Sequence, residues 1–135
     1  MANALYGLGR EGFLGGDIDW DADTIKVVLV DAGDYTLNID TDQYLDDIAA
    51  AGQIAISDAL ASKTKTLGVA DAADITLSTV SGDQFEYIVV FQDSGDSSTS
   101  RLIACIDSAT GLACTPNGGD ITIQWDSGAN KIFKL

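Results

Sequence analysis

Four aspartates alternate in the segment GDIDWDADT, and carboxylates so close together are the kind of group that binds a divalent cation. They are Asp17, Asp19, Asp21 and Asp23. An EF-hand loop starting at Asp17 would need a glycine at its sixth position and a glutamate at its twelfth, where the chain has Ala22 and Val28. The four residues are therefore only weak metal candidates. A solvated acidic edge that discourages strand aggregation is the alternative, and we expect no bound metal or cofactor.

The tripeptide Asp-Ser-Gly occurs at Asp93 and again at Asp126, and paired aspartates in such loops share a proton in aspartic proteases. The first copy lies between Gln92 and Asp96, which add polarity and charge where that chemistry needs a dry site. The same tripeptide is common in turns. With no histidine in the chain, neither a Ser-His-Asp triad nor a Cys-His dyad can form. We therefore expect no enzymatic activity and no catalytic residues.

The glycines and cysteines point to no further ligand site. Glycines cluster at 7–12 and 118–119, but neither cluster matches a phosphate-binding loop or a dinucleotide fingerprint. Two cysteines without histidine do not make a zinc site. The segment between Cys105 and Cys114 could form a hairpin that brings the sulfurs together. Two reduced thiols, as in a reducing compartment, are the interpretation that we favour over a disulfide.

Length and composition fit one small globular domain. The chain has 135 residues, of which 46% are hydrophobic. Its 21 acidic residues against 7 basic ones give a net charge of −14. A field of that sign repels phosphate backbones and anionic lipids, so we expect neither a nucleic-acid nor a membrane partner. We find no apolar run of bilayer-spanning length and no secretory signal pattern at the first residues, so we expect a protein made and used in a cytosol.

The acidic residues are almost all aspartate, the exceptions being Glu11 and Glu86. Aspartate prefers turns and caps, whereas glutamate suits helix interiors, so this bias indicates a mainly β protein. A helix is predicted from Asn3, as its N-cap, to about Leu14, and a second short helix from about Thr41 to Ala51. The remaining periodic segments are predicted strands: 24–30, 53–58, 62–68, 74–80, 85–92, 101–107, 120–126 and 131–135.

Turns and alternation predict how these strands assemble. Turns at 81–83 and 127–130 are expected to join the strands on either side of them as hairpins. In strand 24–30, Ile25, Val27 and Leu29 point to one face and the residues between them to the other, so both faces should be covered. We expect an all-β fold with one or two short helices, a β-sandwich or jelly roll. It forms a single domain over 1–135, with 1–16 as an N-terminal helical segment.

Three segments of the chain carry a family likeness. They are ALYGLGREGFLGGDIDWDADTIKVVLVDAGDYTLNIDTDQYLDDI, TSRLIACIDSATGL and TPNGGDITIQWDSGANKIFKL. In these segments the chain resembles small virion proteins of tailed bacteriophages, whose all-β relatives serve as cement or decoration proteins on icosahedral heads. The resemblance implies a capsid cement protein on the exterior of the virion, assembled in the bacterial cytoplasm, with the major capsid protein as its partner. It brings no catalytic or metal-binding residues.

A cement protein works by contact, so we expect many copies, as homodimers or homotrimers, to bridge adjacent capsomers. The two terminal segments are the expected contact regions, because a chain end can pair with a neighbour's strand edge. The predicted contact residues are Leu5, Tyr6, Leu8, Phe13, Phe133 and Leu135. The alternative is that both segments close the core of their own chain.

Two other functions stay open at this point. The protein could be a structural component of the phage tail or baseplate. It could also be a β-sandwich displayed on the virion that binds a glycan or receptor, with Trp20, Tyr35 and Tyr44 near predicted loops as sugar-stacking candidates.

Overall fold

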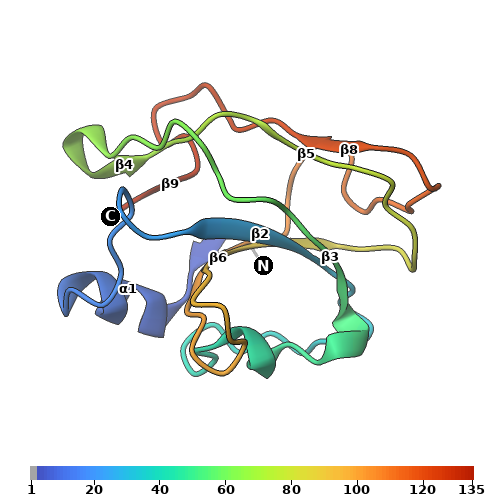
Figure 1. The fold of residues 1–135 in the computed structure, drawn as a ribbon, viewed down its shortest axis with the longest axis horizontal. Coiled ribbons are helices and arrows are strands. Elements are labelled where there is room, and N and C mark those ends of the chain that lie inside the picture. Colours follow the sequence, from blue (N-terminus) through green and yellow to red (C-terminus); the bar gives the residue numbers. More distant parts are fainter. Residues whose placement is uncertain (1–2) are drawn as a thin grey trace.

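An antiparallel sheet of five strands runs through the middle of the protein (Figure 1), whose computed structural model describes residues 3–135. Its strands lie in the order β1-β7-β6-β2-β3, and every neighbouring pair is antiparallel. The strands are β1 (Ala4–Leu5), β2 (Ile25–Val30), β3 (Gln53–Ile56), β6 (Tyr87–Gln92) and β7 (Leu102–Ile106). The predicted all-β class is confirmed, while the jelly-roll topology stays a prediction.

Two smaller sheets lie over one face of the central sheet (Figure 1). One pairs β4 (Val69–Ala70) with β9 (Phe133–Lys134), and the other pairs β5 (Ile75–Leu77) with β8 (Ile121–Ile123). Loops and two short 3₁₀ helices, η1 (Leu45–Asp47) and η2 (Ala50–Gly52), cover the opposite face, and a third, η3 (Thr66–Gly68), precedes β4. The α-helix α1 (Gly7–Leu14) packs beside β7. No helix in the described part of the chain is long and apolar enough to cross a bilayer.

The central sheet is buried on both faces, as the alternation along strand 24–30 predicts. Val27 and Leu29 belong to the larger core, under the two small sheets. Val28 and Val30 belong to a second core on the opposite face. The neighbouring β6 divides in the same way: Ile88 and Val90 join the larger core, Val89 and Phe91 the second. Because both faces are covered, a strand with scarcely any polar residue is stable here.

Both predicted hairpins are wrong. The turn at 81–83 carries the chain from β5, in a small sheet, to β6, in the central sheet, and β5 pairs with β8 instead. In the same way β9 pairs with β4 and not with β8. Phe85 forms an isolated bridge with Cys114, so Cys114 does not face Cys105, which pairs with Val89. Both thiols are free.

The predicted helices are shorter than expected because aspartate and asparagine side chains bind nearby backbone groups. The Asn3 side chain accepts hydrogen bonds from the N–H groups of Asp107 and Ser108, so the helix begins at Gly7 and not at Asn3. In the expected helix 41–51, carboxylates of Asp42 and Asp47 accept backbone N–H groups at the start of the segment. This competition leaves only η1 and η2.

The segment 62–68, predicted as a strand, is largely a turn. It contributes one bridge, between Thr64 and Asp71, and ends in η3. Ser62 and Leu67 have φ values of 54° and 56°, which a continuous strand does not allow.

The second core contains a hydrogen-bonded network of tyrosines. The hydroxyl of Tyr6 lies 3.0 Å from that of Tyr35, and Tyr35 donates to a carboxylate oxygen of Asp42 at 2.5 Å. Burial raises the pKa of both phenols above their ordinary value of 10.0. Burial likewise raises the pKa of the Cys105 thiol to about 12. These groups are therefore held neutral inside the protein.

Removal of the central hydroxyl from this network should destabilise the protein. We expect Tyr35→Phe to lower the free energy of unfolding by about 1–2 kcal/mol, because it leaves the buried Tyr6 hydroxyl without this partner. Urea denaturation measures the change. Tyr44→Phe, at a half-buried tyrosine outside this network, is the matched control. An equal loss in the control would contradict the network.

The same network predicts alkaline unfolding. The raised pKa values mean that the unfolded tyrosines and Cys105 lose protons at a lower pH than the folded ones. Stability is fully present below the unfolded thiol pKa of 9.0 and falls as pH rises above it, and more steeply above 10.0. Melting temperatures from pH 7 to 11 check this. A melting temperature that stays constant to pH 11 would contradict it.

Candidate functional site

The two terminal segments meet at one end of the molecule. Figure 1 shows α1, β4, β9 and the C-terminus side by side there. The ring of Phe133 lies 5.8 Å from that of Phe13 and 5.3 Å from that of Trp20, in an edge-on arrangement with the latter. Residues from opposite ends of the sequence therefore share one aromatic cluster.

A groove of about 380 Å³ opens beside this cluster. Most of the side chains that line it are apolar: Phe13, Ile18, Trp20, Ala70, Phe133 and Leu135. Asp19 and Lys65 add charge to the lining. We call this feature the terminal groove.

Three exposed leucines line the terminal groove or adjoin its lining residues in sequence. Leu135 lines it and is 57% exposed, whereas Leu14 and Leu67 adjoin lining residues in sequence and are 91% and 92% exposed. Leu67 also has a φ of 56°, in the left-handed region that a branched aliphatic residue rarely adopts. Packing within this chain does not explain a large apolar side chain that is both strained and solvated, which makes Leu67 a candidate contact residue. We call Leu14, Leu67 and Leu135 the leucine rim.

The structure divides the predicted contact residues into accessible and buried ones. Leu135 is exposed, and Leu5, Leu8 and Phe13 are half-buried. Phe133 is only 8% exposed, although it is among the residues that line the terminal groove. Tyr6 is completely buried in the second core, so its side chain is not available to a partner and it leaves the set of contact residues. Sequence reasoning missed Leu14 and Leu67, because exposure of an apolar residue has no signature in the sequence.

The four alternating aspartates do not converge on a common point. Asp17 lies 3.5 Å from Arg101, and Asp21 forms an ion pair with Lys65, which raises the pKa of that lysine. Asp23 accepts a hydrogen bond from the N–H of Asp19 at 2.8 Å. The Asp19 carboxylate in turn accepts the next N–H groups of the turn, from Asp21 and Ala22. Each carboxylate thus serves a local contact.

The two Asp-Ser-Gly tripeptides each form a turn. The carboxylate of each aspartate accepts the N–H of the glycine two residues on, from Gly95 and Gly128. Lys26 lies 2.8 Å from Asp93, and this hydrogen-bonded ion pair holds the pKa of that carboxyl below its usual range. A proton-sharing pair needs a raised pKa, so this arrangement gives no support to acid-base chemistry at Asp93.

The sugar-stacking candidates are covered. Trp20 and Tyr35 are each only 5% exposed, and both belong to the cores. Tyr44 is half-buried, with the guanidinium of Arg101 at 5.7 Å from its ring centre. These three aromatics do not form an open platform for a glycan.

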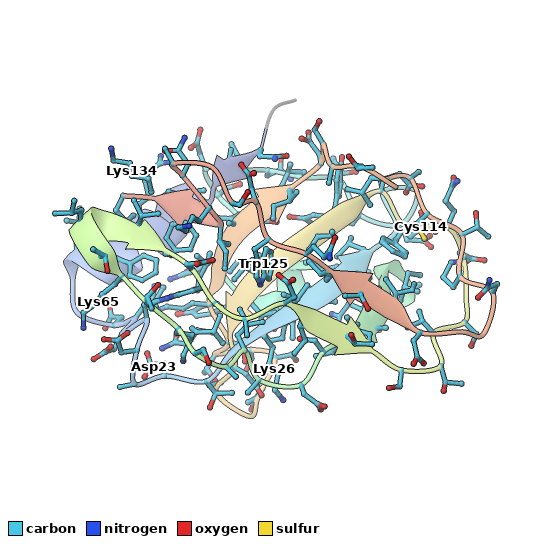
Figure 2. All side chains as sticks on the ribbon, turned by 90° about the horizontal axis from the view of Figure 1, so that it is seen from above. Asp23, Lys26, Lys65, Cys114, Trp125 and Lys134 are labelled. Carbon is cyan, nitrogen blue, oxygen red and sulfur yellow. The ribbon has the colours of Figure 1, made fainter. Side chains whose placement is uncertain are left out.

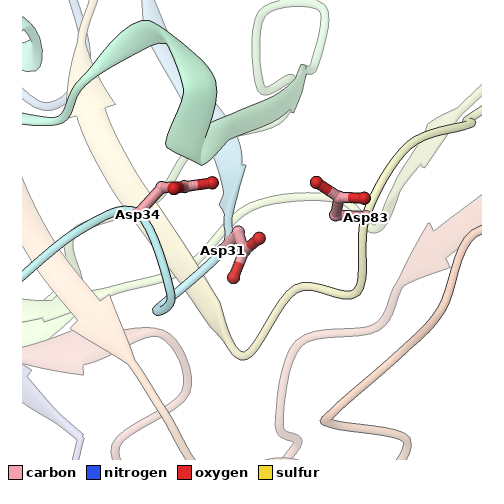
Figure 3. A group of neighbouring side chains, drawn as sticks. All are labelled: Asp31, Asp34 and Asp83. Atoms are coloured by element: carbon pink, nitrogen blue, oxygen red, sulfur yellow. The ribbon is translucent and has the colours of Figure 1, made fainter.

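A different group of carboxylates does converge. One carboxylate oxygen from each of Asp31, Asp34 and Asp83 lies within 4.8 Å of the others (Figure 3). Within residues 3–135, this is the one group of three or more such side chains close enough to share a metal ion. Asp34 and Asp83 are exposed and Asp31 is half-buried. We call these residues the acidic trio. Sequence reasoning missed it because the fold alone brings Asp83 beside the other two.

The protein as a whole therefore presents an apolar groove at one end and a local concentration of negative charge elsewhere. No protein-family model matches the chain, and no curated protein sequence matches it either.

Proposed function

We propose that this protein is a phage capsid cement protein, which binds the outside of the head lattice and stabilises it without catalysis. The observation that carries the proposal is the terminal groove with its leucine rim, built where the two terminal segments meet. Its partner is the major capsid protein. The resemblance of the three sequence segments to tailed-phage virion proteins supports the same assignment.

The energetics of such a contact suit a lattice. Burial of one exposed leucine side chain contributes about 1.5–3 kcal/mol, so the leucine rim alone gives a modest contact. Many copies on one shell multiply that contribution, and copies assembled as dimers or trimers gain further from simultaneous binding. The net charge of −14 keeps free copies soluble and repels packaged DNA, which favours the outer surface of the shell.

Leu67→Asn separates binding from folding. Asparagine adopts the left-handed region more readily than leucine does, so we expect the melting temperature to stay constant or rise. Loss of the apolar contact should weaken binding to purified heads roughly tenfold or more. Cosedimentation with heads that lack the protein measures this. Ala109→Asn, at an exposed loop residue that does not line the terminal groove, is the control.

Two outcomes would overturn the proposal. One is unchanged binding of Leu67→Asn together with an equally exposed Leu14→Asn. The other comes from mass spectrometry of purified heads and purified tails: detection in tails alone would make the protein a tail or baseplate component instead.

A further inference from the structure

The β3 edge of the central sheet is open. β3 pairs with β2 on one side, and no strand of the described chain pairs with its other side. Ala55 pairs with Leu29, and the N–H of Ser57 bonds to the carbonyl of Val27. Alternate residues of a strand direct their backbone groups to opposite sides, so Ile56 turns its N–H and C=O away from β2. Its side chain is 46% exposed.

A groove runs along this open edge. It has a volume of about 380 Å³ and lies between 54–58, on the β3 side, and 76–81, which begins in β5. More than half of its lining residues are polar: Ser57, Asp58, Thr76, Ser78, Thr79 and Ser81. We call it the edge groove. An extended peptide has the shape and the backbone hydrogen-bonding groups that a groove beside an unpaired strand accepts.

The acidic trio lies at one end of the edge groove. Asp31 directly follows Val30, which pairs with Gln53 at the start of β3. Asp83 follows Gly82, where an added Cβ would lie 3.4 Å from the side chain of Ile54. Figure 3 shows the three carboxylates grouped beside this part of the chain. Carboxylates held this close repel one another, and a guanidinium or ammonium group between them would relieve that repulsion.

We propose that the edge groove binds an extended segment of a partner protein as an added strand beside β3, with a basic side chain of that segment against the acidic trio. The negative charge of the acidic trio favours a basic segment over a second copy of this chain as the occupant. A second copy of the chain, with its net charge of −14, is opposed at this acidic edge in particular, whereas a basic segment is attracted. The contact is separate from the terminal groove and does not depend on it.

The position of the edge groove gives one copy two contacts. Figure 1 places the terminal groove elements α1, β4 and β9 at one end of the longest axis and β3 toward the other. A single copy that binds at both ends would connect two neighbouring subunits. On the proposed cement function, two such contacts would be a direct structural basis for bridging adjacent capsomers.

A pair of synthetic peptides tests the added strand. One is a fluorescent Thr-Val-Arg-Val-Thr peptide with blocked ends, and the other has glutamate in place of arginine. We expect the arginine peptide to bind in the millimolar range or better and to protect the Ile56 amide from hydrogen exchange. The glutamate peptide should bind roughly tenfold more weakly at low salt. Fluorescence anisotropy and amide exchange are the measurements.

Variants of the protein assign the binding to these residues. Asp83→Asn should weaken the arginine peptide several-fold, and Glu11→Gln, with the same charge change on α1 at the other end, should not. Ile56→Pro removes the outward N–H and should abolish binding; proline is tolerated at an edge strand whose N–H faces solvent. If that variant does not fold, protection of Ile56 in the unsubstituted protein decides the same point. Leu67→Asn should bind the peptide normally.

Three results would overturn the proposal. The first is equal binding of the two peptides, or binding of neither. The second is binding without protection of Ile56. The third is protection of Ile56 in the free protein that increases with concentration, together with a dimer in analytical ultracentrifugation, because a second copy would then be the occupant.

Discussion

Phe133→Ala is expected to lower the free energy of unfolding by about 3–4 kcal/mol, which is a large fraction of the stability of a domain this size. Phe133 is 8% exposed and contacts the rings of Phe13 and Trp20. It also pairs with Ala70, so it joins β9 to β4. Its removal leaves a cavity at the point where the two terminal segments meet. Urea denaturation measures the loss.

Two controls accompany this variant. Phe133→Leu keeps an apolar side chain and should lose less than half as much stability. Lys134→Ala, at the exposed neighbour in β9, should change stability by less than about 0.5 kcal/mol. A loss below 1 kcal/mol for Phe133→Ala would contradict the packing described for the terminal segments. If the protein binds phage heads as proposed, that binding should fall in parallel, because Phe133 lines the terminal groove.

Gly9→Ala should cost about 2–3 kcal/mol although alanine favours helices over glycine by about 1 kcal/mol. A Cβ at Gly9 would lie 2.6 Å from the carbonyl oxygen of Leu102 and 3.1 Å from the Cα of Ile103. Both are backbone atoms of β7 in the central sheet, and they cannot move aside as a side chain can. The helix must therefore shift away from β7.

Gly119→Ala is the matched control. Its added Cβ would meet only the side chain of Asn117, whose amide oxygen is 3.0 Å away; this oxygen accepts the N–H of Gly119, but it belongs to an exposed side chain that can shift by a few tenths of an ångström. We expect a change of less than about 0.5 kcal/mol there, as for most surface substitutions. Thermal unfolding of both variants compares the two positions. A Gly9→Ala variant as stable as the unsubstituted protein would show that α1 does not pack against β7 as described.

Alternation along the strands could be predicted because it is a local property. The two faces of β2 were expected from the order of its residues, and the structure divides both β2 and β6 between two cores in this alternating way. The same holds for β8, where Ile121 and Ile123 face the larger core and Thr122 is exposed. Burial of apolar side chains decides these faces whichever strand lies beside them.

Strand partners could not be predicted, because they depend on groups that are far apart in the sequence. Ile75 pairs with Ile123, and the turn at 81–83 is as compatible with a hairpin as with a change of layer. The glycines of α1 were also ambiguous. In sequence they weaken a helix, whereas in the structure Gly9 and Gly12 allow it to approach its neighbours closely.

The candidate contact surfaces were predicted only in part. The terminal segments were expected as contact regions, and Phe13, Phe133 and Leu135 do line one groove. Exposure could not be foreseen: Tyr6 is buried, whereas Leu67 is exposed through a turn that replaced an expected strand. The acidic trio depends on Asp83 being brought beside β3, which no local pattern indicates.

The direction of the central strands has a mechanical consequence. β2 pairs with β6 along its whole length, from Ile25 opposite Gln92 to Val30 opposite Tyr87. Figure 2 shows the central strands from above, where they cross the longest axis obliquely, with Lys65 toward one end of the molecule and Cys114 toward the other. Interstrand hydrogen bonds lie perpendicular to the strands. A pull on β2 along its own direction would load the bonds between β2 and β6 together, in shear, and not one after another, so this pair of strands would resist tension along that direction more strongly than a peeling force.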